Sequence, residues 1–445
     1  MGISPWAYVL GNCLKPRIST MPEKIIVYSS KENANGFTLK EFLFRNLVSF
    51  DYRETNGDDL PFTTEGPKEE CLPAIEFPDG TVLIDPQLFT VAAKIGLNQA
   101  PKETCYDLAV MGAGPAGLTA AVYGGSEGLS TIVIERHSPG GRIGSTSLVE
   151  NVLGHPKGIT GEAFAAASRE QAEKFGVEFV IPVELKRVER DDELLRLHLS
   201  NGVSFQAKAL IVAAGVKYRL LNVPGADRLT GAGVYYGAAL IEGRRNKGKV
   251  VYVVGGANSA GQAAMYFSRY AAQVNMIIRG GELEGRMSEY LIREIHDVHN
   301  ICIQNHSEIV RVNGDNYLES IEIRDVNTGE IRVNKLDSLF LLIGGEPHAE
   351  CVSDLLLRDP NGFLITGPQL EEDPRFQETW PLDRRPASLE TNIPGVFVAG
   401  DVRMGSAKRM AAAMGDGANA IQQALDYIRE MENVNGRKPM VTAKI

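Results

Sequence analysis

Two kinds of segment alternate along most of the chain, distinguished by the pattern of their hydrophobic positions. Short, mainly apolar runs are typical of buried strands, and they occur at 106–110, 131–135, 250–254 and 274–278. Between the two members of each pair lies a segment with the apolar spacing of a helix, at 115–126 and at 261–269. Each set predicts a strand–helix–strand unit with parallel strands. The pattern therefore predicts an α/β protein in which this unit occurs twice.

Residues 21–97 show a different pattern, which predicts a separate small domain. The expected elements are a strand, a helix, a second strand, a hairpin and a last helix, at 24–28, 38–46, near Phe50, 74–84 and 87–95. Pro78-Asp79-Gly80 supplies the hairpin turn, because proline presets φ and glycine tolerates positive φ. This order, with Leu72-Pro73 before the hairpin, resembles a thioredoxin or glutaredoxin domain. An unrelated small α/β module is the alternative.

A dinucleotide-binding fingerprint follows the first strand of the first unit. In Gly112-Ala113-Gly114-Pro115-Ala116-Gly117, Gly112 permits the tight turn and Gly114 lets a pyrophosphate approach the backbone. Gly117 allows close packing of helix on strand. The helix begins at Pro115, and the bare N–H groups of the first turn, from Ala116 onward, favour phosphate. Glu135 ends the next strand, where an acid accepts from ribose hydroxyls. The glycine pattern thus stands in its full context of strand, helix and acid, which is much more specific than the pattern alone.

A second fingerprint follows the strand at 250–254. Its loop consists of Gly255, Gly256, Ala257, Asn258, Ser259 and Ala260, and Arg279 follows the next strand. Two such fingerprints in one chain predict two nucleotides, a flavin and a nicotinamide. Ala257 replaces the second glycine and adds a methyl group where the pyrophosphate approaches.

Composition and charge exclude several function classes. The chain has 445 residues, 44% hydrophobic and 23% charged, with a net charge of −10. The acidic balance argues against nucleic-acid binding, because phosphate contacts need a surplus of Lys and Arg. The sequence shows neither a membrane span, nor a signal peptide, nor a metal-ligand motif. The five cysteines are Cys13, Cys71, Cys105, Cys302 and Cys351; this scattered set, with no CxxC, favours a cytoplasmic protein.

Four separated motifs resemble the flavin-cradling segments of low-molecular-weight thioredoxin reductases, in the same order, over residues 106–428. They are the segments 140–142, 150–154 with 158–161, 395–402 and 408–410. The resemblance implies that Asp401 binds the ribitol of FAD and that the backbone of 408–410 reaches the flavin pyrimidine. The further flavin contacts it implies are Gly141, Arg142, Asn151, Gly400, Lys408, Arg409 and Met410.

The resemblance also implies a discontinuous architecture. The fold class is then α/β, with two Rossmann-like, three-layer ββα nucleotide-binding domains, the second inserted into the first and preceded by a small thioredoxin-like domain. The FAD domain is expected at 103–222 and 341–434, and the NAD(P)-binding domain at 223–340. The thioredoxin-like domain is expected at 21–97, a peripheral or unstructured extension at 1–20 and a tail at 435–445. Members of this family are homodimers.

The dithiol of the family is missing from this sequence. Aligned from Gly233-Val234, the two family cysteines fall on Gly237 and Leu240. The thioredoxin-like block also lacks a CxxC, since Ser29 to Ala34 contains no thiol. The pattern resembles a subgroup of thioredoxin-reductase-like flavoproteins without CxxC.

The altered nicotinamide loop leaves three alternatives for the donor. Members of the family that use NADPH carry several arginines after the second strand, whereas this chain keeps Arg279, with Arg286 as a further candidate and Glu284 at the later position. We expect weak NADPH binding, weak NADH binding or loss of the nicotinamide. Ser259, Ala260 and Arg279 are the expected nicotinamide contacts.

Three functions remain open at this point. The first is an FAD-dependent oxidoreductase that passes electrons from NAD(P)H, or another donor, to a non-disulfide or external acceptor. The second is a reductase of thioredoxin-type disulfides that uses remote or partner thiols, with Cys71 and Cys351 as candidates and the N-terminal domain as the surface for a redox partner protein. The third is a non-catalytic FAD-binding sensor or interaction protein.

Overall fold

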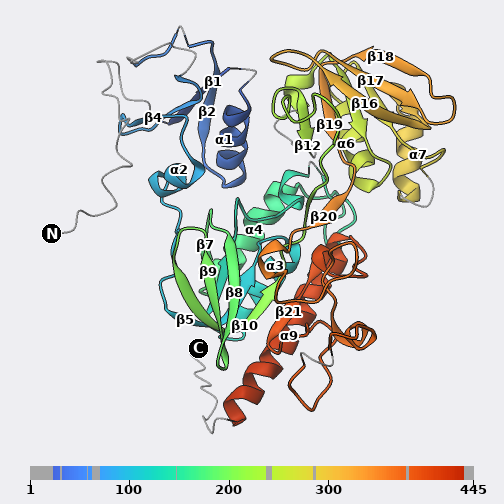
Figure 1. The fold of residues 1–445 in the computed structure, drawn as a ribbon. Helices are drawn as coiled ribbons and strands as arrows, with labels where there is room; N and C mark the ends of the chain where they lie inside the picture. Colours follow the sequence, from blue (N-terminus) through green and yellow to red (C-terminus); the bar gives the residue numbers. More distant parts are fainter. Residues whose placement is uncertain are drawn as a thin grey trace. The chain divides into compact units, whose positions relative to one another are not determined.

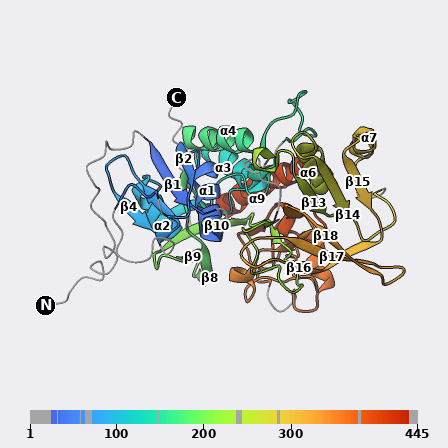
Figure 2. The same ribbon diagram turned by 90° about the horizontal axis from the view of Figure 1, so that it is seen from above.

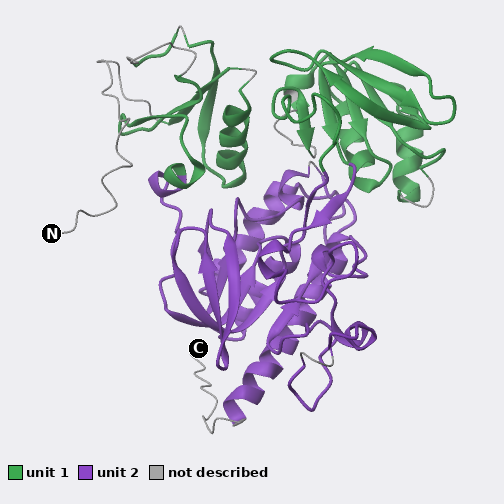
Figure 3. Cartoon of the chain, in the orientation of Figure 1, with its two compact units in different colours: residues 1–91, 220–342 green, residues 92–219, 343–445 purple. Residues whose placement is uncertain are grey.

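The computed structural model describes residues 24–30, 33–57, 59–62, 71–146, 148–236, 243–283, 287–376 and 380–434. The chain forms two compact units, coloured separately in Figure 3. One unit contains residues 1–91 and 220–342, and the other contains residues 92–219 and 343–445. The predicted extension at 1–20, the dithiol positions 237 and 240, and the tail at 435–445 lie outside the described residues.

The unit of residues 92–219 and 343–445 is built on a seven-stranded sheet in the order β7-β6-β5-β10-β9-β8, with β21 also paired to β10. Its strands are β5 (Cys105–Met111), β6 (Thr131–Ile134), β7 (Glu178–Val180), β8 (Leu185–Asp191), β9 (Leu194–Leu199), β10 (Ser204–Val212) and β21 (Val396–Val398). Strands β7, β6, β5, β10 and β21 run parallel, whereas β8 and β9 are antiparallel additions. This is the expected sheet of a Rossmann-like domain.

Three helices pack beside this sheet and lie side by side in Figures 1 and 2. They are α3 (Pro115–Ser126), α4 (Gly161–Lys174) and α9 (Met410–Val434). Leu108 and Val110 of β5 are fully buried in the cluster that contains Ala120 of α3 and Ala420 of α9. The intervening Ala109 belongs to a second cluster on the opposite face of the sheet. The alternation of apolar contacts on both faces explains why the strand reads as a continuous apolar run.

Short elements complete this unit. A two-stranded antiparallel ribbon pairs β11 (Val216–Tyr218) with β20 (Gly345–Pro347). Single turns of 3₁₀ helix are η3 (Ile143–Ser145), η5 (Glu350–Val352) and η7 (Gly400–Val402), and η6 (Gly367–Glu372) is longer.

The second Rossmann-like sheet lies in the unit of residues 1–91 and 220–342, in the order β12-β19-β13-β14-β15 with all strands parallel. Its strands are β12 (Val234–Tyr236), β13 (Val250–Val254), β14 (Gln273–Ile277), β15 (Ile301–Gln304) and β19 (Ser338–Leu341). The helices are α6 (Asn258–Ser268) and α7 (Glu289–Asp297), with one 3₁₀ turn, η4 (Arg244–Asn246). An antiparallel sheet follows, with β16 (Ser307–Asn313), β17 (Ser320–Asp325) and β18 (Ile331–Lys335). The two parallel sheets confirm the predicted α/β fold class.

The N-terminal segment of the same unit forms a four-stranded sheet in the order β2-β1-β3-β4. Its elements are β1 (Ile25–Ser29), α1 (Ala34–Arg45), β2 (Phe50–Glu54), β3 (Ala74–Glu76), β4 (Val82–Ile84) and α2 (Leu88–Lys94). Strand β1 is parallel to β2 and antiparallel to β3, and the Leu72–Pro73 peptide bond is cis.

This N-terminal segment contacts the second Rossmann-like sheet. The rings of Phe37 and Tyr235 lie 5.1 Å apart between centroids. Glu54 forms an ion pair with Arg245 at 3.0 Å. Helix α1 and strand β2 thus both pack against the segment around β12 and η4.

Two helices begin earlier than the sequence predicts. Helix α1 was expected from residue 38, but it begins at Ala34 because the side chain of Asn33 accepts from Gly36 N. Helix α6 was expected from Gly261, but it begins at Asn258, directly after the glycine loop. Both corrections place the first helical turn closer to the preceding strand.

Candidate flavin and nicotinamide sites

Three strands of the first Rossmann-like sheet end in register at one edge. Val212 pairs with Met111 on one side and with Val398 on the other. The loops that follow these strands therefore begin side by side, at Gly112, Ala213 and Ala399. The carboxyl edge of a parallel sheet is where such folds bind ligands.

The predicted phosphate-binding loop forms a tight turn at this edge. Gly112 has φ +96°, and a β-carbon there would lie 2.7 Å from the carbonyl oxygen of Ala213. A β-carbon on Gly117 would lie 1.9 Å from the carbonyl oxygen of Gly112. By contrast, a β-carbon on Gly114 would meet no atom within 4 Å. Gly112 and Gly117 are thus required by the fold, whereas Gly114 faces open space.

The start of helix α3 fits a phosphate group beside that open space. Its N-cap is Gly114, which has no side chain to cap the helix, and Pro115 opens the first turn. Backbone N–H groups at a helix start favour an anion through both hydrogen bonding and the helix dipole. Gly141 also approaches the loop, because its β-carbon would lie 3.0 Å from the α-carbon of Gly114.

The carboxylate of Glu135 stabilises the phosphate-binding loop through a hydrogen bond to the loop backbone. It is buried at 7% exposure, and its Oε2 accepts from Ala113 N at 2.8 Å while its Oε1 accepts from His137 N at 2.9 Å. A carboxylate oxygen accepts more than one hydrogen bond, so these contacts leave acceptor capacity. The contact of Glu135 with a ribose therefore stays a prediction. Its observed role is to stabilise the loop that begins at Gly112.

Asp401 lies at the same edge, after β21. Burial raises the pKa of its half-buried carboxyl, although the charges of Lys408 and Arg142 act in the opposite direction. Among the residues that the structure describes, its carboxylate has no hydrogen-bond partner, whereas its backbone carbonyl accepts from Lys408 Nζ at 2.6 Å. A partly buried, unpartnered acceptor is costly unless a ligand satisfies it. The hydroxyl groups of a ribitol chain suit this position.

The remaining predicted flavin contacts come from segments that are far apart in the sequence. Met410, at the start of α9, is buried with Val149 and Val152, so the loop that carries Asn151 lies against residue 410. Asn151 itself is exposed. The guanidinium of Arg142 lies over the ring of Tyr218, 5.0 Å from its centroid. Arg409 is exposed at the start of α9.

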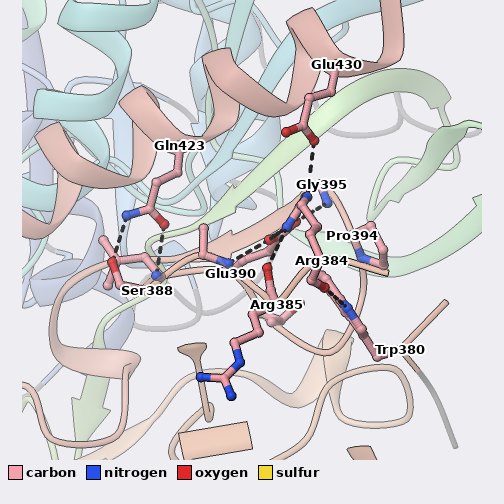
Figure 4. A network of polar contacts seen from close by, with 12 residues as sticks. Trp380, Arg384, Arg385, Ser388, Glu390, Pro394, Gly395, Gln423 and Glu430 are labelled. Atoms are coloured by element: carbon pink, nitrogen blue, oxygen red, sulfur yellow. Dashed lines mark hydrogen bonds and ion pairs between the residues drawn. The ribbon is translucent and has the colours of Figure 1, made fainter. Parts of the chain in front are cut away.

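A buried network that the sequence did not predict positions the segment leading to Asp401. Glu390 is fully buried and receives two hydrogen bonds from the guanidinium of Arg384, at 2.7 and 3.0 Å (Figure 4). The same carboxylate accepts from the backbone N of Ala387 at 2.9 Å and of Gly395 at 3.3 Å. Gly395 directly precedes β21, so this network fixes the strand. A single acid in a loop carries no sequence signal for this role.

A second unpredicted residue supports the same turn from helix α9. The carboxylate of Asp416 accepts from Gly400 N at 3.1 Å and forms an ion pair with Arg403 at 3.2 Å. Gly417 follows it, and a β-carbon there would lie 2.2 Å from the carbonyl oxygen of Ala116. Helix α9 thus packs directly on the start of α3 and on Gly400. The open space at Gly114, the unpartnered Asp401 and the uncapped α3 together fit FAD.

The second fingerprint forms the corresponding loop in the other unit. Gly255 follows β13, and Ala257 is the exposed N-cap of α6 with no side-chain capping bond. Asn258 is used within the protein, because its Oδ1 accepts from Ser288 N at 2.7 Å. Ser259 is exposed, whereas Ala260 is fully buried. The backbone arrangement for a phosphate is present, with the methyl group of Ala257 added to it.

Arg279, the predicted contact for a 2′-phosphate, is already paired. It is 81% exposed and forms an ion pair with Glu308 at 3.0 Å. Glu308 also accepts from Arg324 Nε at 3.0 Å. The contact with Arg324, and then that with Arg279, lowers the pKa of Glu308, so the acid is charged at neutral pH. A 2′-phosphate at Arg279 would face this carboxylate; Glu284 and Arg286 lie outside the described residues.

The aromatic residues before the dithiol positions pack inside their own unit. Tyr235 is 5% exposed and stacks on Phe340 with centroids 5.2 Å apart. The hydroxyl of Tyr236 accepts from Leu221 N at 3.0 Å. Both side chains therefore have packing and hydrogen-bonding roles within this unit.

None of the four cysteines that the structure describes forms a disulfide. Cys71 is buried, Cys105 and Cys302 are exposed, and Cys351 is partly buried with its sulfur 3.7 Å from Met111 Sδ. Burial raises the pKa of the Cys351 thiol to about 12, which leaves almost no thiolate at neutral pH. Cys13 lies outside the described residues.

The described part of the chain contains neither a membrane-spanning helix nor a cluster of metal ligands. No helix there is both long and apolar enough to cross a bilayer. No group of three or more His, Cys, Asp and Glu side chains there is arranged to hold a metal ion.

Known proteins are similar to this chain in both sequence and fold. The family model of the pyridine nucleotide-disulphide oxidoreductases matches residues 106–417. Thioredoxin reductase of Bacillus subtilis is 32% identical over 332 residues, which cover 74% of this chain and 97% of that protein. One component of alkyl hydroperoxide reductase from Staphylococcus aureus is 28% identical over 377 residues, covering 83% of this chain and 69% of that protein. The crystal structure of Lactococcus lactis thioredoxin reductase in the FR conformation aligns with a TM-score of 0.65 at 30% identity, over 73% of this chain and 99% of that one.

Proposed function

The chain belongs to the pyridine nucleotide-disulphide oxidoreductase family, as a thioredoxin-reductase-like flavoprotein, and we propose that it is an FAD-dependent oxidoreductase that works without a dithiol of its own. The observation that carries the proposal is the pair Gly237 and Leu240 at the two cysteine positions of the family. A disulfide reductase needs a thiolate to accept electrons and attack a disulfide. Neither side chain does this, so the proposed electron acceptor is a compound other than a disulfide.

The flavin site is the better preserved part of the machinery. Bound FAD would supply the two-electron chemistry, taking hydride from a reduced nicotinamide and passing electrons to the acceptor. Helix α3 and Gly114 would hold the pyrophosphate, and the carboxylate of Asp401 would accept from the ribitol hydroxyls. Gly141, Arg142 and the segment 408–410 would line the remainder of the flavin. Arg384 and Glu390 act indirectly, by holding the strand before Asp401.

The nicotinamide donor binds weakly in this proposal. The methyl group of Ala257 reduces the space through which the pyrophosphate would approach the backbone. Glu308 competes with a 2′-phosphate for Arg279. These features disfavour NADPH more than NADH, because only NADPH carries the additional phosphate. NADH is therefore the proposed donor of the two.

A second candidate function follows from the same altered loop. If Ala257 and the Glu308 pair abolish nicotinamide binding, FAD is a structural group or a redox sensor in a non-catalytic protein. The N-terminal segment, which packs on Tyr235 and Arg245, is then the surface for a protein partner. This candidate predicts a flavin that neither nicotinamide reduces.

The acceptor class is tested by steady-state turnover with two compounds. With NADH as donor, we expect reduction of 1,4-benzoquinone and no reduction of the disulfide 5,5′-dithiobis(2-nitrobenzoate). Turnover with the disulfide that disappears in Cys351→Ser or Cys71→Ser would contradict the proposal and establish remote thiols instead. Cys302→Ser, an exposed cysteine of the other Rossmann-like domain, is the matched control.

The assembly state is also a proposal. The family resemblance implies a homodimer, and light scattering of the purified flavoprotein tests it. A mass near twice the chain mass of 48.4 kDa is expected. A monomer at micromolar concentration would contradict it.

A further inference from the structure

A cavity outside the predicted nucleotide sites lies within the unit of residues 92–219 and 343–445. It has a volume of about 370 Å³ and is bordered by the β11–β20 ribbon and the turn at 358–363. This is the size of a site for one small organic molecule. No motif of the sequence pointed to it.

Three basic side chains line the cavity, and two of them are already paired. Lys217 forms an ion pair with Glu350 at 2.5 Å, and Arg219 forms a longer one with Glu346 at 3.7 Å. The third, Arg358, is only partly exposed and has neither an ion pair nor a side-chain hydrogen bond within the described ranges. A partly buried guanidinium is normally paired. The lining thus carries one more positive than negative charge, and that charge resides on Arg358.

Part of the cavity lining is apolar. It consists of the ring of Phe363 and Pro347 of β20. The turn that carries Phe363 is fixed, because the carboxylate of Asp359 accepts from Asn361 N at 2.9 Å and from Phe363 N at 2.8 Å. The backbone that carries the ring is therefore held in place before any ligand arrives, which lowers the entropy lost on binding.

The cavity is separate from the flavin motifs but adjoins them. Side chains alternate along a strand, so Lys217 faces the cavity while the next residue, Tyr218, packs under Arg142 on the other side. The ammonium of Lys408 lies over the ring of Phe363, 3.8 Å from its centroid, and donates to the carbonyl of Asp401. Lys408 therefore connects a ligand that lies on Phe363 with Asp401, since it contacts both residues.

We propose that this cavity is a second binding site, which takes a flat organic monoanion of the aromatic carboxylate class. The carboxylate pairs with the guanidinium of Arg358, whose planar fork matches two carboxylate oxygens. The ring lies against Phe363 and Pro347. The single excess positive charge favours a monoanion over inorganic phosphate, which carries more charge and no apolar surface. The proposal goes beyond the oxidoreductase function and does not depend on it.

The test is isothermal titration calorimetry of the flavin-loaded protein with sodium benzoate, cyclohexanecarboxylate and inorganic phosphate as probes. We expect benzoate to bind at one site per chain, cyclohexanecarboxylate to bind several-fold more weakly, and phosphate to show no saturable binding. Arg358→Gln should weaken benzoate binding about tenfold or more, since it removes a charge-assisted pair. The matched control Arg385→Gln, an arginine of the same unit that is 87% exposed, should bind as the wild type does.

A second variant keeps the test decisive if Arg358→Gln does not fold. Phe363→Leu preserves an apolar contact but removes the flat ring, so it should reduce the preference for benzoate over cyclohexanecarboxylate. The absence of benzoate binding in the wild type, or equal benzoate binding in wild type and Arg358→Gln, would overturn the proposal. Phosphate binding as tight as benzoate binding would overturn the assigned ligand class. None of these readouts requires turnover with a nicotinamide.

Discussion

Gly117 lies so close to Gly112 that a β-carbon on it would be 1.9 Å from the carbonyl oxygen of Gly112. Gly114, in the same loop, has no atom within 4 Å of the place where its β-carbon would be. The two glycines therefore serve different purposes, one for the packing of α3 on β5 and one for the ligand.

This difference gives the first prediction. Gly114→Ala should fold with near-normal stability but retain much less flavin, because its methyl group occupies the approach of the pyrophosphate. Gly117→Ala should fail to fold or lose several kcal/mol, as overpacking against backbone does. The ratio of flavin absorbance to protein absorbance, together with thermal unfolding, checks both variants. A Gly114→Ala protein with full flavin content would contradict the assigned site.

The second prediction concerns Asp401, whose carboxyl pKa is raised by burial. Asp401→Asn should weaken FAD binding about tenfold, because a charged acceptor is replaced by a neutral one. The flavin-free Asp401→Asn protein should nevertheless be more stable than the flavin-free wild type at pH 7. Fluorescence titration with FAD and urea unfolding measure the two effects.

The pH dependence of this difference follows from the direction of the shift. The folded-state pKa of Asp401 lies above its unfolded value, so the native state holds the proton more tightly and its stability falls as pH rises through this range. Asparagine removes that loss. The stability advantage of Asp401→Asn should therefore vanish near pH ~3, below the ordinary pKa of aspartate. An advantage that is constant with pH would show that ionisation is not its cause.

The third prediction concerns the buried pair of Arg384 and Glu390. Arg384→Ala should destabilise the protein by about 3 kcal/mol, because it leaves a fully buried carboxylate without its charged partner. Flavin content should fall too, since Glu390 holds Gly395 before the strand that leads to Asp401. Urea unfolding of the flavin-loaded protein measures the first effect.

Arg385→Ala is the control for that prediction. Arg385 is 87% exposed and pairs with Glu371 at 3.3 Å on the surface. Its removal should change the free energy of unfolding by less than about 0.5 kcal/mol. Equal effects of the two substitutions would mean that the network of Figure 4 has no special role.

The fourth prediction concerns the choice between NADH and NADPH. Glu308→Gln should improve NADPH binding relative to NADH about fivefold, because it removes the acid that pairs with Arg279. Glu330→Gln, which breaks an exposed pair with Arg332 in the same unit, should leave the ratio unchanged. Dissociation constants for both nucleotides, measured at low ionic strength, give the ratio. An unchanged ratio in Glu308→Gln would exclude Arg279 as the contact for the 2′-phosphate.

The sequence predicted the parts of the site that depend on local backbone geometry. The spacing of Gly112, Gly114 and Gly117 after an apolar strand is such a signal. The tight turn, the approach of the pyrophosphate to the backbone and the packing of helix on strand each require glycine. The start of α1 shows the limit of this reasoning. Asn33 caps that helix, but a single asparagine among polar residues did not mark the helix start more strongly than Thr38 did.

Contacts between distant segments were not predictable in this way. Met410 packs on Val149, Asp416 supports Gly400 and Glu390 holds Gly395, and each pairing is created by the tertiary fold. The pairing of Arg279 with Glu308 is of the same kind, since Arg279 alone suggested a free phosphate contact. Periodicity identifies which face of an element is buried, but it does not identify the partner of a polar side chain.

An anaerobic titration of the purified flavoprotein with NADH and with NADPH, followed by the flavin absorbance near ~450 nm, tests the central claim most directly. The claim is a working oxidoreductase without its own dithiol. It predicts that NADH bleaches the flavin fully, that NADPH does so only at higher concentration, and that a quinone restores the absorbance. A stable yellow protein that neither nucleotide bleaches at millimolar concentration would contradict the claim and would establish a flavin that is not reduced by nicotinamides.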